Sequence, residues 1–414
     1  AINDNNVTII TGGPGTGKTT IIKSIIEIYK QKKYKIVLCA PTGRAAKRMS
    51  ETTGEEASTL HRLLEIGKVD EESLFKKDNE YQGAPIDGDI IIVDEVSMVD
   101  MFIMSYLLDC IYQGTKLILV GDSDQLPSVG PGSVLKDLIA SEKIVTVHLD
   151  KIFRQAAKSK IIVNAHRVNN GKGFISKDDP ELEEDANQDF FFIKENNQDK
   201  ILKEVLSLCN GRLKNFGEYD FFENIQVLTP TKKGLLGTKE LNKALQEELN
   251  PHREGEAEKN SMGAIFRIGD RVMQIKNNYD MHWERLCDSG VETGNGIFNG
   301  ETGIITNINE KGKILSVKFD DEKVCKYEFN DLEQIEHSYC MTIHKAQGSE
   351  FDVVIMIVPQ AAPMLLTRNL LYTGLTRAKK LLIVIGNDRV VDYMIKNVDS
   401  KKRNTGLEFK LRNM

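Results

Sequence analysis

The sequence predicts an α/β protein of two lobes, each with a parallel sheet, and a small antiparallel β-barrel inserted into the second lobe. Three observations support this prediction: short apolar runs that alternate with helical stretches, a glycine-rich loop between the first run and the first helix, and short β runs with glycine turns late in the chain. The 414 residues suffice for two to three domains.

Composition and charge exclude some classes of protein. The chain is 40% hydrophobic and 28% charged, as in globular proteins. No apolar run approaches ~20 residues, so no membrane span is expected, and no secretion signal is recognisable at the N-terminus. The net charge of −6 argues against bulk electrostatic binding of nucleic acid but permits a local basic channel. The six cysteines form no C-x-x-C pair, which favours reduced core thiols in a cytoplasmic protein.

The lobes have expected boundaries. Apolar runs at 7–10, 36–40, 90–93, 117–120 and 144–149 predict the strands of a first lobe at 1–152. A polar excursion at 67–88 is either a surface loop or a small functional hairpin. The second lobe is expected at 153–262 and 337–414, with a helix at 160–169 and strands at 225–229, 353–358 and 381–386, and the barrel is expected at 263–336.

A glycine-rich loop, GGPGTGKTT at 12–20, fits the pattern G-x-x-x-x-G-K-[ST] between a predicted strand and a predicted helix. Its glycines allow backbone N–H groups to point at phosphates, and the start of the helix adds a positive field. Lys18 should reach the β- and γ-phosphates, and the Thr19 hydroxyl should hold Mg²⁺. The residues expected to bind the nucleotide here are Gly13, Pro14, Gly15, Thr16, Gly17, Lys18, Thr19 and Thr20.

Two acids follow a buried apolar run in VDEVSMVD at 93–100. Ligands of α/β sheets lie at the carboxyl ends of strands, where Asp94 is expected. Asp94 can join the Mg²⁺ shell, and Glu95 can orient or deprotonate the attacking water. The alternative is two solvated acids in a turn, and the lysine of the upstream loop weakens it.

Further motifs follow in a characteristic order. They are CAPTGRAAKRM at 39–49, TLHRLL at 59–64, GDSDQLPSVGPG at 121–132, LDKIFRQ at 149–155, VLTPTKKG at 227–234, YCMTIHKAQGSEFDVVI at 339–355 and LYTGLTRAKKLLIVIG at 371–386. With the two motifs above, the chain resembles a RecD-like superfamily-one DNA helicase, the family of the exodeoxyribonuclease V alpha subunit and its stand-alone relatives. The resemblance covers nearly every residue and implies RecA-like P-loop NTPase lobes with an inserted barrel of the Src-homology-three type.

The resemblance implies roles for four more residues near the nucleotide. Gln125 in GDSDQLP looks like a γ-phosphate sensor that couples nucleotide state to the DNA groove. Arg154 in FRQ and Arg377 in LTRA look like the arginines that reach the γ-phosphate, where a planar cation stabilises transition-state charge. Surface salt bridges are the alternative for each arginine. Glu350 in QGSEFD resembles a residue that contacts the nucleotide or supports motif coupling.

The resemblance also implies contacts with a DNA strand. Small hydroxyls, backbone amides and a few cations suit a phosphodiester backbone without reading its sequence. The matching residues are Pro41, Thr42, Gly43, Arg44, Thr59 and His61 in the first lobe, and Thr229, Pro230, Thr231, Thr342, His344 and Lys345 in the second. The two histidines are not interpreted as metal ligands, and a structural role is the alternative for each.

Taken together, the resemblance implies an ATP- and Mg²⁺-dependent DNA helicase. Such a protein hydrolyses ATP between its lobes, moves 5′ to 3′ along single-stranded DNA, and unwinds duplex DNA in repair or recombination. The expected partners are single strands and duplex junctions, met by a monomeric motor, with other repair proteins as further candidates. One rival is an ATP-switched DNA-binding or scaffold subunit that does not translocate; another is an RNA-directed or 3′-to-5′ motor.

The sequence departs from the family pattern in two places, whereas the excursion at 67–88 lies where related motors carry a small projection that splits the duplex. The adenine-contacting glutamine of the family lies upstream of the first strand and has no counterpart here, so we expect a helicase core without the N-terminal region and with impaired purine recognition. Residues 282–296 are expected to lengthen a turn of the barrel. The excursion at 67–88 carries Phe75 and Tyr81, which are expected to stack on the last base pair of a duplex. No nuclease signature of clustered carboxylates is present in the sequence.

Overall fold

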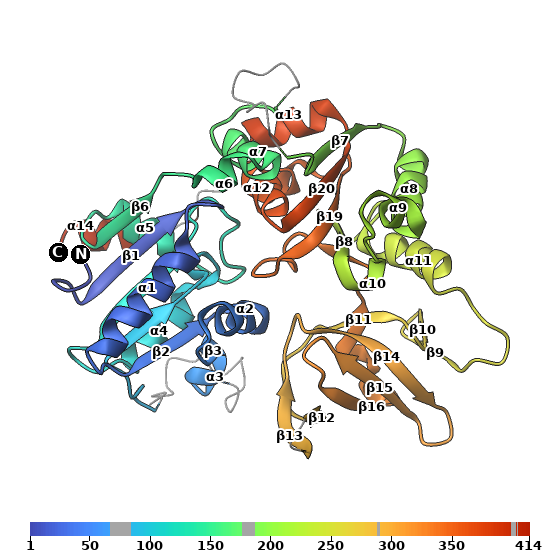
Figure 1. The fold of residues 1–414 in the computed structure, drawn as a ribbon, viewed down its shortest axis with the longest axis horizontal. Helices are drawn as coiled ribbons and strands as arrows, with labels where there is room; N and C mark the ends of the chain where they lie inside the picture. The colour runs from blue at the N-terminus through green and yellow to red at the C-terminus, as the bar shows by residue number, and fades with distance from the viewer. Residues whose placement is uncertain (67–83, 176–186, 288–289, 399–402, 404) are drawn as a thin grey trace. The chain divides into compact units, whose positions relative to one another are not determined.

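The computed structural model describes residues 1–66, 84–175, 187–287, 290–398, 403 and 405–414 (Figure 1). These residues form two compact units. The first unit comprises Ala1–Gln188, Thr367–Thr376 and Ile395–Met414, and the second comprises Asp189–Leu366 and Arg377–Met394. Within the described ranges, no helix is both long and apolar enough to cross a membrane. Most of the excursion at 67–88, including Phe75 and Tyr81, lies outside the described residues.

The first unit is built on a six-stranded sheet of order β3-β2-β4-β5-β1-β6, in which every pairing is parallel. The central strand β4 is an unbroken apolar run with all four residues buried, as expected for a parallel strand covered on both faces. The strands are β1 (Val7–Gly12), β2 (Ile36–Ala40), β3 (Ala57–Thr59), β4 (Ile90–Val93), β5 (Lys116–Gly121) and β6 (Val145–Leu149).

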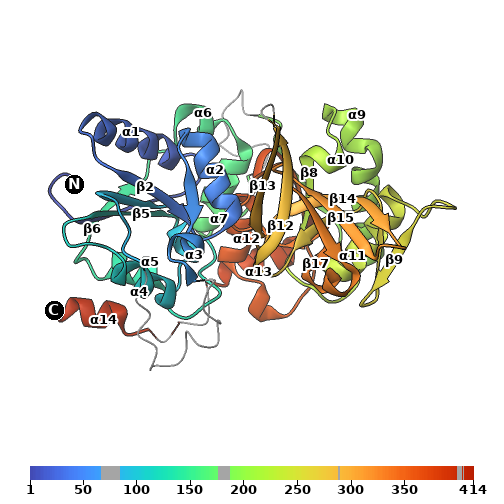
Figure 2. The ribbon, with the colours of Figure 1, turned by 90° about the horizontal axis from the view of Figure 1, so that it is seen from below.

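Helices cover both faces of this sheet because alternate strand residues point to opposite sides. Ile90 and Ile92 pack on the side of α1, whereas Ile91 and Val93 pack with α4 and α5. Figure 2 shows α1 and the pair α4 and α5 on opposite sides of the strands. The helical segments are α1 (Lys18–Gln31), α2 (Gly43–Thr53), α3 (Leu60–Leu63), η3 (Val96–Met98), α4 (Met101–Asp109), α5 (Val134–Ala140) and α14 (Leu407–Arg412).

Three further helices belong to the first unit: α6 (Arg154–Ala157), α7 (Lys160–Asn169) and α12 (Arg368–Leu375). The sequence predicts a first lobe that ends at 152, whereas the compact unit continues to Gln188 and includes α12. The helices are tied together, since Arg368 Nη1 donates to the carbonyl of Asn169 at 3.2 Å. All three helices also pack on the glycine-rich loop, through Ala156, His166 and Tyr372. Contacts between a helix and a distant loop cannot be predicted from the periodicity of strands and helices.

The second unit contains a five-stranded parallel sheet of order β18-β8-β19-β20-β7. Its core joins the strand residues Ile355 and Ile383 to Val205 of α8 and Leu241 of α11. The strands are β7 (Phe190–Lys194), β8 (Ile225–Thr229), β18 (Cys340–Thr342), β19 (Phe351–Val358) and β20 (Ala378–Gly386). The helical segments are α8 (Gln198–Ser207), η4 (Leu208–Arg212), α9 (Leu213–Gly217), α10 (Phe221–Asn224), α11 (Thr238–Leu249), η6 (Pro363–Leu365) and α13 (Asp388–Lys396).

An antiparallel SH3-like sheet is inserted into the second unit, with the order β13-β12-β16-β15-β14-β11-β17. The expected change to short antiparallel strands is confirmed. The segments are the hairpin β9 (Glu258–Ser261) and β10 (Ala264–Arg267), then β11 (Arg271–Gln274), β12 (Asn278–Cys287), β13 (Gly290–Ile297), β14 (Thr302–Asn309), β15 (Ile314–Phe319), β16 (Val324–Glu328), η5 (Phe329–Gln334) and β17 (Ile335–His337).

Two expectations need correction in this sheet. The segment expected to lengthen a turn, 282–296, instead supplies strand residues: 282–287 lie in β12 and 290–296 lie in β13, and Trp283 pairs with Gly294. A Cβ at Gly294 would lie 2.3 Å from the Trp283 ring, so the indole occupies the space that glycine leaves. The hairpin also carries Cys287, which is exposed, whereas the other five cysteines are buried as expected.

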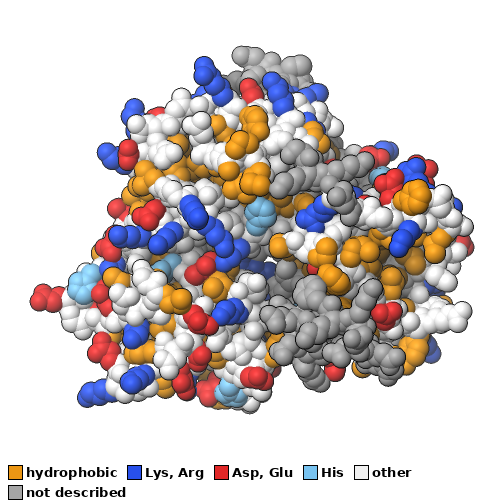
Figure 3. Space-filling model, turned by 180° about the vertical axis from the view of Figure 1, so that it is seen from behind, with side chains coloured by type: hydrophobic (Ala, Val, Ile, Leu, Met, Phe, Trp, Pro, Cys, Tyr) orange, Lys and Arg blue, Asp and Glu red, His pale blue; other side chains and the backbone are white. Residues whose placement is uncertain are grey.

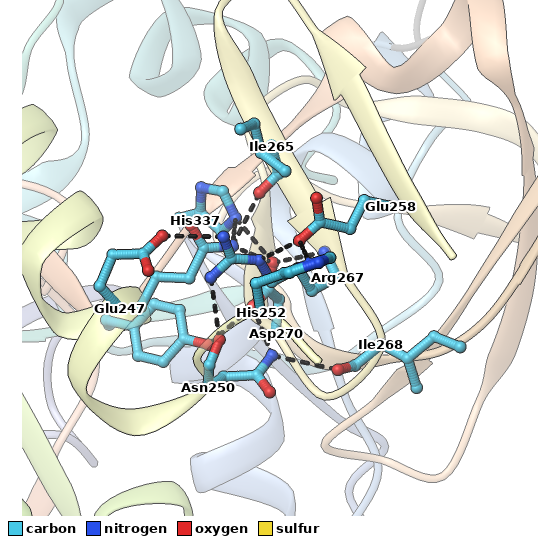
Figure 4. A network of polar contacts seen from close by, with 11 residues as sticks. Glu247, Asn250, His252, Glu258, Ile265, Arg267, Ile268, Asp270 and His337 are labelled. Carbon is cyan, nitrogen blue, oxygen red and sulfur yellow. Dashed lines mark hydrogen bonds and ion pairs between the residues drawn. The ribbon is translucent and has the colours of Figure 1, made fainter. Parts of the chain in front are cut away.

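A buried carboxylate connects this sheet to α11 (Figure 4). Asp270 is fully buried and accepts a hydrogen bond from the Arg267 amide at 2.7 Å and from Asn250 Nδ2 at 2.8 Å. Tyr339 Oη donates to the same carboxylate at 2.9 Å, and His337 Nε2 lies 2.9 Å from it. A buried charge is tolerated when it is hydrogen-bonded in this way, so Asp270 fixes how the inserted sheet joins the rest of its unit.

Candidate functional site

The glycine-rich loop connects β1 to α1, as the sequence predicts. Gly15 and Gly17 have φ angles of 72° and 86°, which side-chain-bearing residues rarely adopt. A Cβ at Gly17 would also lie 2.3 Å from the ring of Phe153, and a Cβ at Gly15 would lie 2.8 Å from Ala156 Cβ. The loop therefore needs glycine both for its curl and for the close approach of α6.

Side chains around the loop hold its shape. Lys18 Nζ donates to the carbonyls of Gly12 and Gly13, the latter at 3.0 Å. Thr16 Oγ1 donates to the Gly13 carbonyl at 2.8 Å, and His166 Nε2 of α7 lies 3.1 Å from the Pro14 carbonyl. The side chains of Thr19 and Thr20, by contrast, are exposed at the start of α1. A ligand can thus meet the Thr19 hydroxyl and the first N–H groups of the helix.

Asp94 and Glu95 follow β4 at its carboxyl end. The Glu95 amide donates to Asp94 Oδ1 at 2.8 Å, and Glu95 itself has a left-handed backbone with φ 53°. Burial, followed by repulsion from Glu95, raises the pKa of the Asp94 carboxyl to about 6, although Arg48 and Lys18 act to lower it. Because the two acids are buried and adjacent, cationic groups beside them are favoured.

Arg48 is a residue of this site that the sequence analysis did not assign. It lies on α2, and its Nη2 is 2.7 Å from Glu95 Oε1 and 3.8 Å from Asp94 Oδ2. Its position within the CAPTGRAAKRM motif was the available signal. Arg48 stands four residues beyond Arg44, the last expected strand contact of that motif, and this spacing alone did not indicate that its side chain points at Glu95.

Gln125 lies in the loop after β5, close to a second buried carboxylate. Gln125 Nε2 is 3.4 Å from Asp122 Oδ2, and among the described residues Gln125 Oε1 has no hydrogen-bond partner although it is buried. Tyr372 Oη of α12 donates to Asp122 Oδ2 at 2.7 Å. Burial raises the pKa of Asp122, while Lys18 and the Tyr372 hydrogen bond act to lower it. The unused acceptor of Gln125 suits a residue that senses a ligand.

Helix α12 also fixes the backbone of this loop. Asn369 Nδ2 donates to the Gln125 carbonyl at 3.3 Å, and the Leu126 amide donates to Thr373 Oγ1 at 2.9 Å. Asp122 and Tyr372 are therefore functional candidates that the sequence analysis missed. Asp122 stands in a motif that it quoted, whereas Tyr372 is separated from Asp122 by 250 positions, a distance that no local pattern bridges.

The two expected arginines are placed less directly. Arg154 begins α6 in the first unit, and its side chain lies outside the described part of the structure. Arg377 belongs to the second unit, where only 2% of it is exposed and Nη1 donates to the Ser349 carbonyl at 3.0 Å. Glu350 is exposed in the same unit. The nucleotide roles of all three stay predictions.

The expected strand contacts of the first unit lie at one edge of its sheet. β2 and β3 are parallel neighbours in which Ala40 pairs with Thr59, so Pro41 and the residues after Thr59 leave the sheet on the same side. Thr42 caps α2 by accepting from the Ala45 amide, and Thr59 caps α3 by accepting from the Arg62 amide, each at 3.2 Å. The remaining residues of this set, Gly43, Arg44 and His61, stand in the first turns of the two helices.

The second unit brings its candidates together in the same manner. β8 and β18 are parallel neighbours in which Thr229 pairs with Thr342, so 229–231 and 342–345 share an edge. His344 is exposed there, and Lys345 forms an ion pair with Glu336. Thr229 departs from the expectation of a direct contact, because its side chain is buried and donates to the Leu236 carbonyl at 2.7 Å. Pro230 and Thr342 are also buried, and Thr342 Oγ1 accepts from the Lys345 amide at 3.3 Å, whereas Thr231 is partly exposed.

Charges of both signs are interspersed on the face of the molecule in Figure 3. The mixture of signs is expected for a chain with 55 basic and 61 acidic residues and a net charge of only −6. A local edge lined by hydroxyls, amides and a few cations is then a better candidate for strand contact than a broad basic surface.

The parallel sheet, the glycine-rich loop and the acidic pair define the first unit as a P-loop nucleotide-binding domain. Family models match three segments of the chain: an AAA domain at 1–131, the SH3 domain of ATP-dependent RecD-like DNA helicases at 241–319, and a UvrD-like helicase C-terminal domain at 337–385.

Comparison with curated proteins identifies the family. The chain is 36% identical over 379 residues to the ATP-dependent RecD2 DNA helicase of Deinococcus radiodurans, a match that covers 91% of this chain and 46% of that protein. It is 30% identical over 464 residues to the RecBCD enzyme subunit RecD of Buchnera aphidicola, covering 95% of this chain and 72% of the relative. The chain belongs to the RecD-like DNA helicase family. It spans only about half the length of the Deinococcus protein.

A solved structure shares the fold. The Pif1 helicase from Bacteroides, in complex with ADP-AlF3 and single-stranded DNA, is 20% identical and aligns with a TM-score of 0.52 over 94% of this chain and 90% of that protein. At 20% identity, this similarity shows a shared fold and says nothing about shared function.

Proposed function

We propose that this chain is the motor of an ATP-dependent DNA helicase, which moves 5′ to 3′ along single-stranded DNA and separates duplex DNA in repair or recombination. The observation that carries the proposal is the convergence of Lys18, Asp94, Glu95 and Gln125 at the carboxyl edge of one parallel sheet. These residue types are those that hydrolysis of a nucleoside triphosphate requires. The name of the Deinococcus relative, a RecD2 DNA helicase, and that of the matching SH3 domain of RecD-like DNA helicases support DNA as the track.

ATP and Mg²⁺ are the cofactors of this proposal, and the residues present fit them. The donors are oxygens, the Thr19 hydroxyl and the Asp94 carboxylate, which suit Mg²⁺. Mg²⁺ bound with ATP would neutralise charge on the phosphates. Burial and repulsion from Glu95 raise the pKa of Asp94 to about 6, so a divalent cation beside this carboxylate would stabilise its charged form.

Each protein group then has a role in the cycle. Lys18 exchanges its hydrogen bonds with the loop carbonyls for the β- and γ-phosphates, and Glu95 orients and deprotonates the attacking water. The vacant Oε1 of Gln125 can accept a hydrogen bond from the attacking water, and its Nε2 can donate to a γ-phosphate oxygen. Asp122 with Tyr372 connects that change to α12. Arg154 and Arg377 would stabilise transition-state charge.

The proposed DNA contacts are non-specific. In the first unit they come from Pro41, Thr42, Gly43, Arg44, Thr59 and His61, and in the second from Thr231, His344 and Lys345, with the buried Thr342 holding the backbone of Lys345. Thr229 and Pro230 shape the turn that presents their neighbours. Backbone contacts of this kind favour affinity without base preference.

ATP hydrolysis measured with and without polynucleotide tests the proposal. Single-stranded DNA should stimulate hydrolysis in the presence of Mg²⁺, with little dependence on base sequence. Stronger stimulation by RNA would favour the RNA-directed motor, and nucleotide binding without turnover would favour the scaffold subunit that does not translocate.

A further inference from the structure

One ion pair connects the proposed catalytic glutamate to the helix that follows β2. Arg48 Nη2 lies 2.7 Å from Glu95 Oε1, and the side chains are only 26% and 7% exposed. The second carboxylate is involved more weakly, since Asp94 Oδ2 is 3.8 Å from the same nitrogen. Hydrogen bonds between a guanidinium and a carboxylate are among the stronger ones in proteins, more so where water is limited.

This pairing opposes the role proposed for Glu95. A general base must offer a lone pair to the water that it activates, and Oε1 is already an acceptor for Arg48. Release of Arg48 would free the oxygen without any change in the nucleotide-binding loop.

The other side of Arg48 leads to the proposed DNA edge. Arg44 and Arg48 are four residues apart on α2 and therefore share a helix face. Thr42 and Gly43 begin the same helix, directly after β2. A phosphate bound at this turn would offer an anion to guanidinium groups on α2, in competition with Glu95.

We propose that Arg48 is a positioning residue that restrains Glu95 in the absence of DNA and releases it when a DNA phosphate binds at the first turn of α2. Hydrolysis of ATP thereby depends on a bound strand. The inference rests on the proposed function, because it assumes that Glu95 is the base and that the α2 edge contacts DNA. All the residues concerned belong to the first unit.

The test compares three variants by their rates of ATP hydrolysis, without DNA and with saturating oligothymidylate. Arg48→Ala removes the ion pair, and Arg48→Gln removes the charge but keeps a hydrogen-bond donor beside the buried carboxylate. Lys47→Ala is the matched control, since Lys47 stands on the same helix, is exposed, and pairs with Glu51 at 3.9 Å. Thermal unfolding of each variant shows whether it is folded.

For both Arg48 variants we expect kcat without DNA to rise about tenfold, the scale of one charged hydrogen bond. The kcat with saturating DNA should stay within about twofold of that of the parent. The ratio of kcat with DNA to kcat without DNA should therefore fall, and KM for ATP should not change. Lys47→Ala should keep the parental ratio.

A folded Arg48→Gln protein that keeps the parental ratio, or that loses both rates together, would overturn the inference. If Arg48→Ala does not fold, Arg48→Gln decides alone. A parent protein that is not stimulated by DNA would instead count against the proposed function itself. These two failures are distinguished because the second appears before any variant is made.

Discussion

Asp94→Asn should stabilise the nucleotide-free protein at neutral and higher pH while it abolishes efficient ATP hydrolysis. Burial and repulsion from Glu95 raise the pKa of Asp94 from 3.8 to about 6. The difference of about two pKa units corresponds to about 3 kcal/mol of unfolding free energy. Asparagine is nearly the same size and still accepts the Glu95 amide, but it carries no charge to bury.

The direction of the pH dependence follows from the raised pKa. The contribution of Asp94 to stability is fully present below its unfolded-state pKa of 3.8 and is lost as the pH rises through about 6. The variant has no such loss, so its advantage over the parent should be small near pH 4 and full near pH 8. At about 2–4 °C per kcal/mol for a domain of this size, the first unit should unfold roughly 6–12 °C higher at pH 8.

Thermal unfolding at pH 5, 6, 7 and 8, without nucleotide or divalent cation, measures this difference. Asp87→Asn is the control, because Asp87 is an exposed carboxylate paired with Lys35 in the same unit, and its replacement should change little. An Asp94→Asn protein that is equally or less stable than the parent at pH 8, or whose advantage does not vary with pH, would refute this account of the acidic pair.

Four other variants test separate parts of the structure. Lys18→Ala should reduce ATP hydrolysis by at least about a hundredfold, which is the scale of losing one charge-stabilising group. Glu95→Gln should still bind ATP but fail to hydrolyse it. Rapid hydrolysis by Glu95→Gln would show that another group is the base. Arg44→Ala should weaken binding to all single strands equally and lower the slope of log affinity against log salt by about 1, and a change confined to one sequence would contradict a backbone contact. Asp270→Ala leaves several buried donors without their acceptor and should cost about 3–5 kcal/mol in chemical denaturation; a loss below about 1 kcal/mol would show that the network is dispensable.

Much of the fold could be predicted from local pattern. Apolar runs such as 36–40 and 225–229 became strands with those bounds, and the helix at 160–169 formed as expected. Runs buried on both faces leave little choice of structure. The β12–β13 hairpin was missed because its strands are largely exposed and polar, so the apolar alternation that reveals a strand is weak there.

The candidate site could be predicted only where one motif carries the chemistry. Lys18, Asp94 and Gln125 stand in short motifs at strand ends, and the sheet brings such ends together. Arg48 and Tyr372 could not be assigned, since their partners depend on which way a helix turns its side chains toward a distant loop. Thr229 is the opposite case. Its motif position predicted a contact with DNA, but its hydroxyl donates to the Leu236 carbonyl within the turn.

Strand separation from tailed duplexes tests the helicase proposal most directly. A duplex with a 5′ single-stranded tail is incubated with the protein, ATP and Mg²⁺, beside the same duplex with a 3′ tail and a blunt duplex, and Lys18→Ala serves as the inactive control. Separation of the 5′-tailed duplex, dependent on ATP and absent with Lys18→Ala, is the predicted result. DNA-stimulated ATP hydrolysis without separation of any duplex, or separation from the 3′ tail alone, would contradict it.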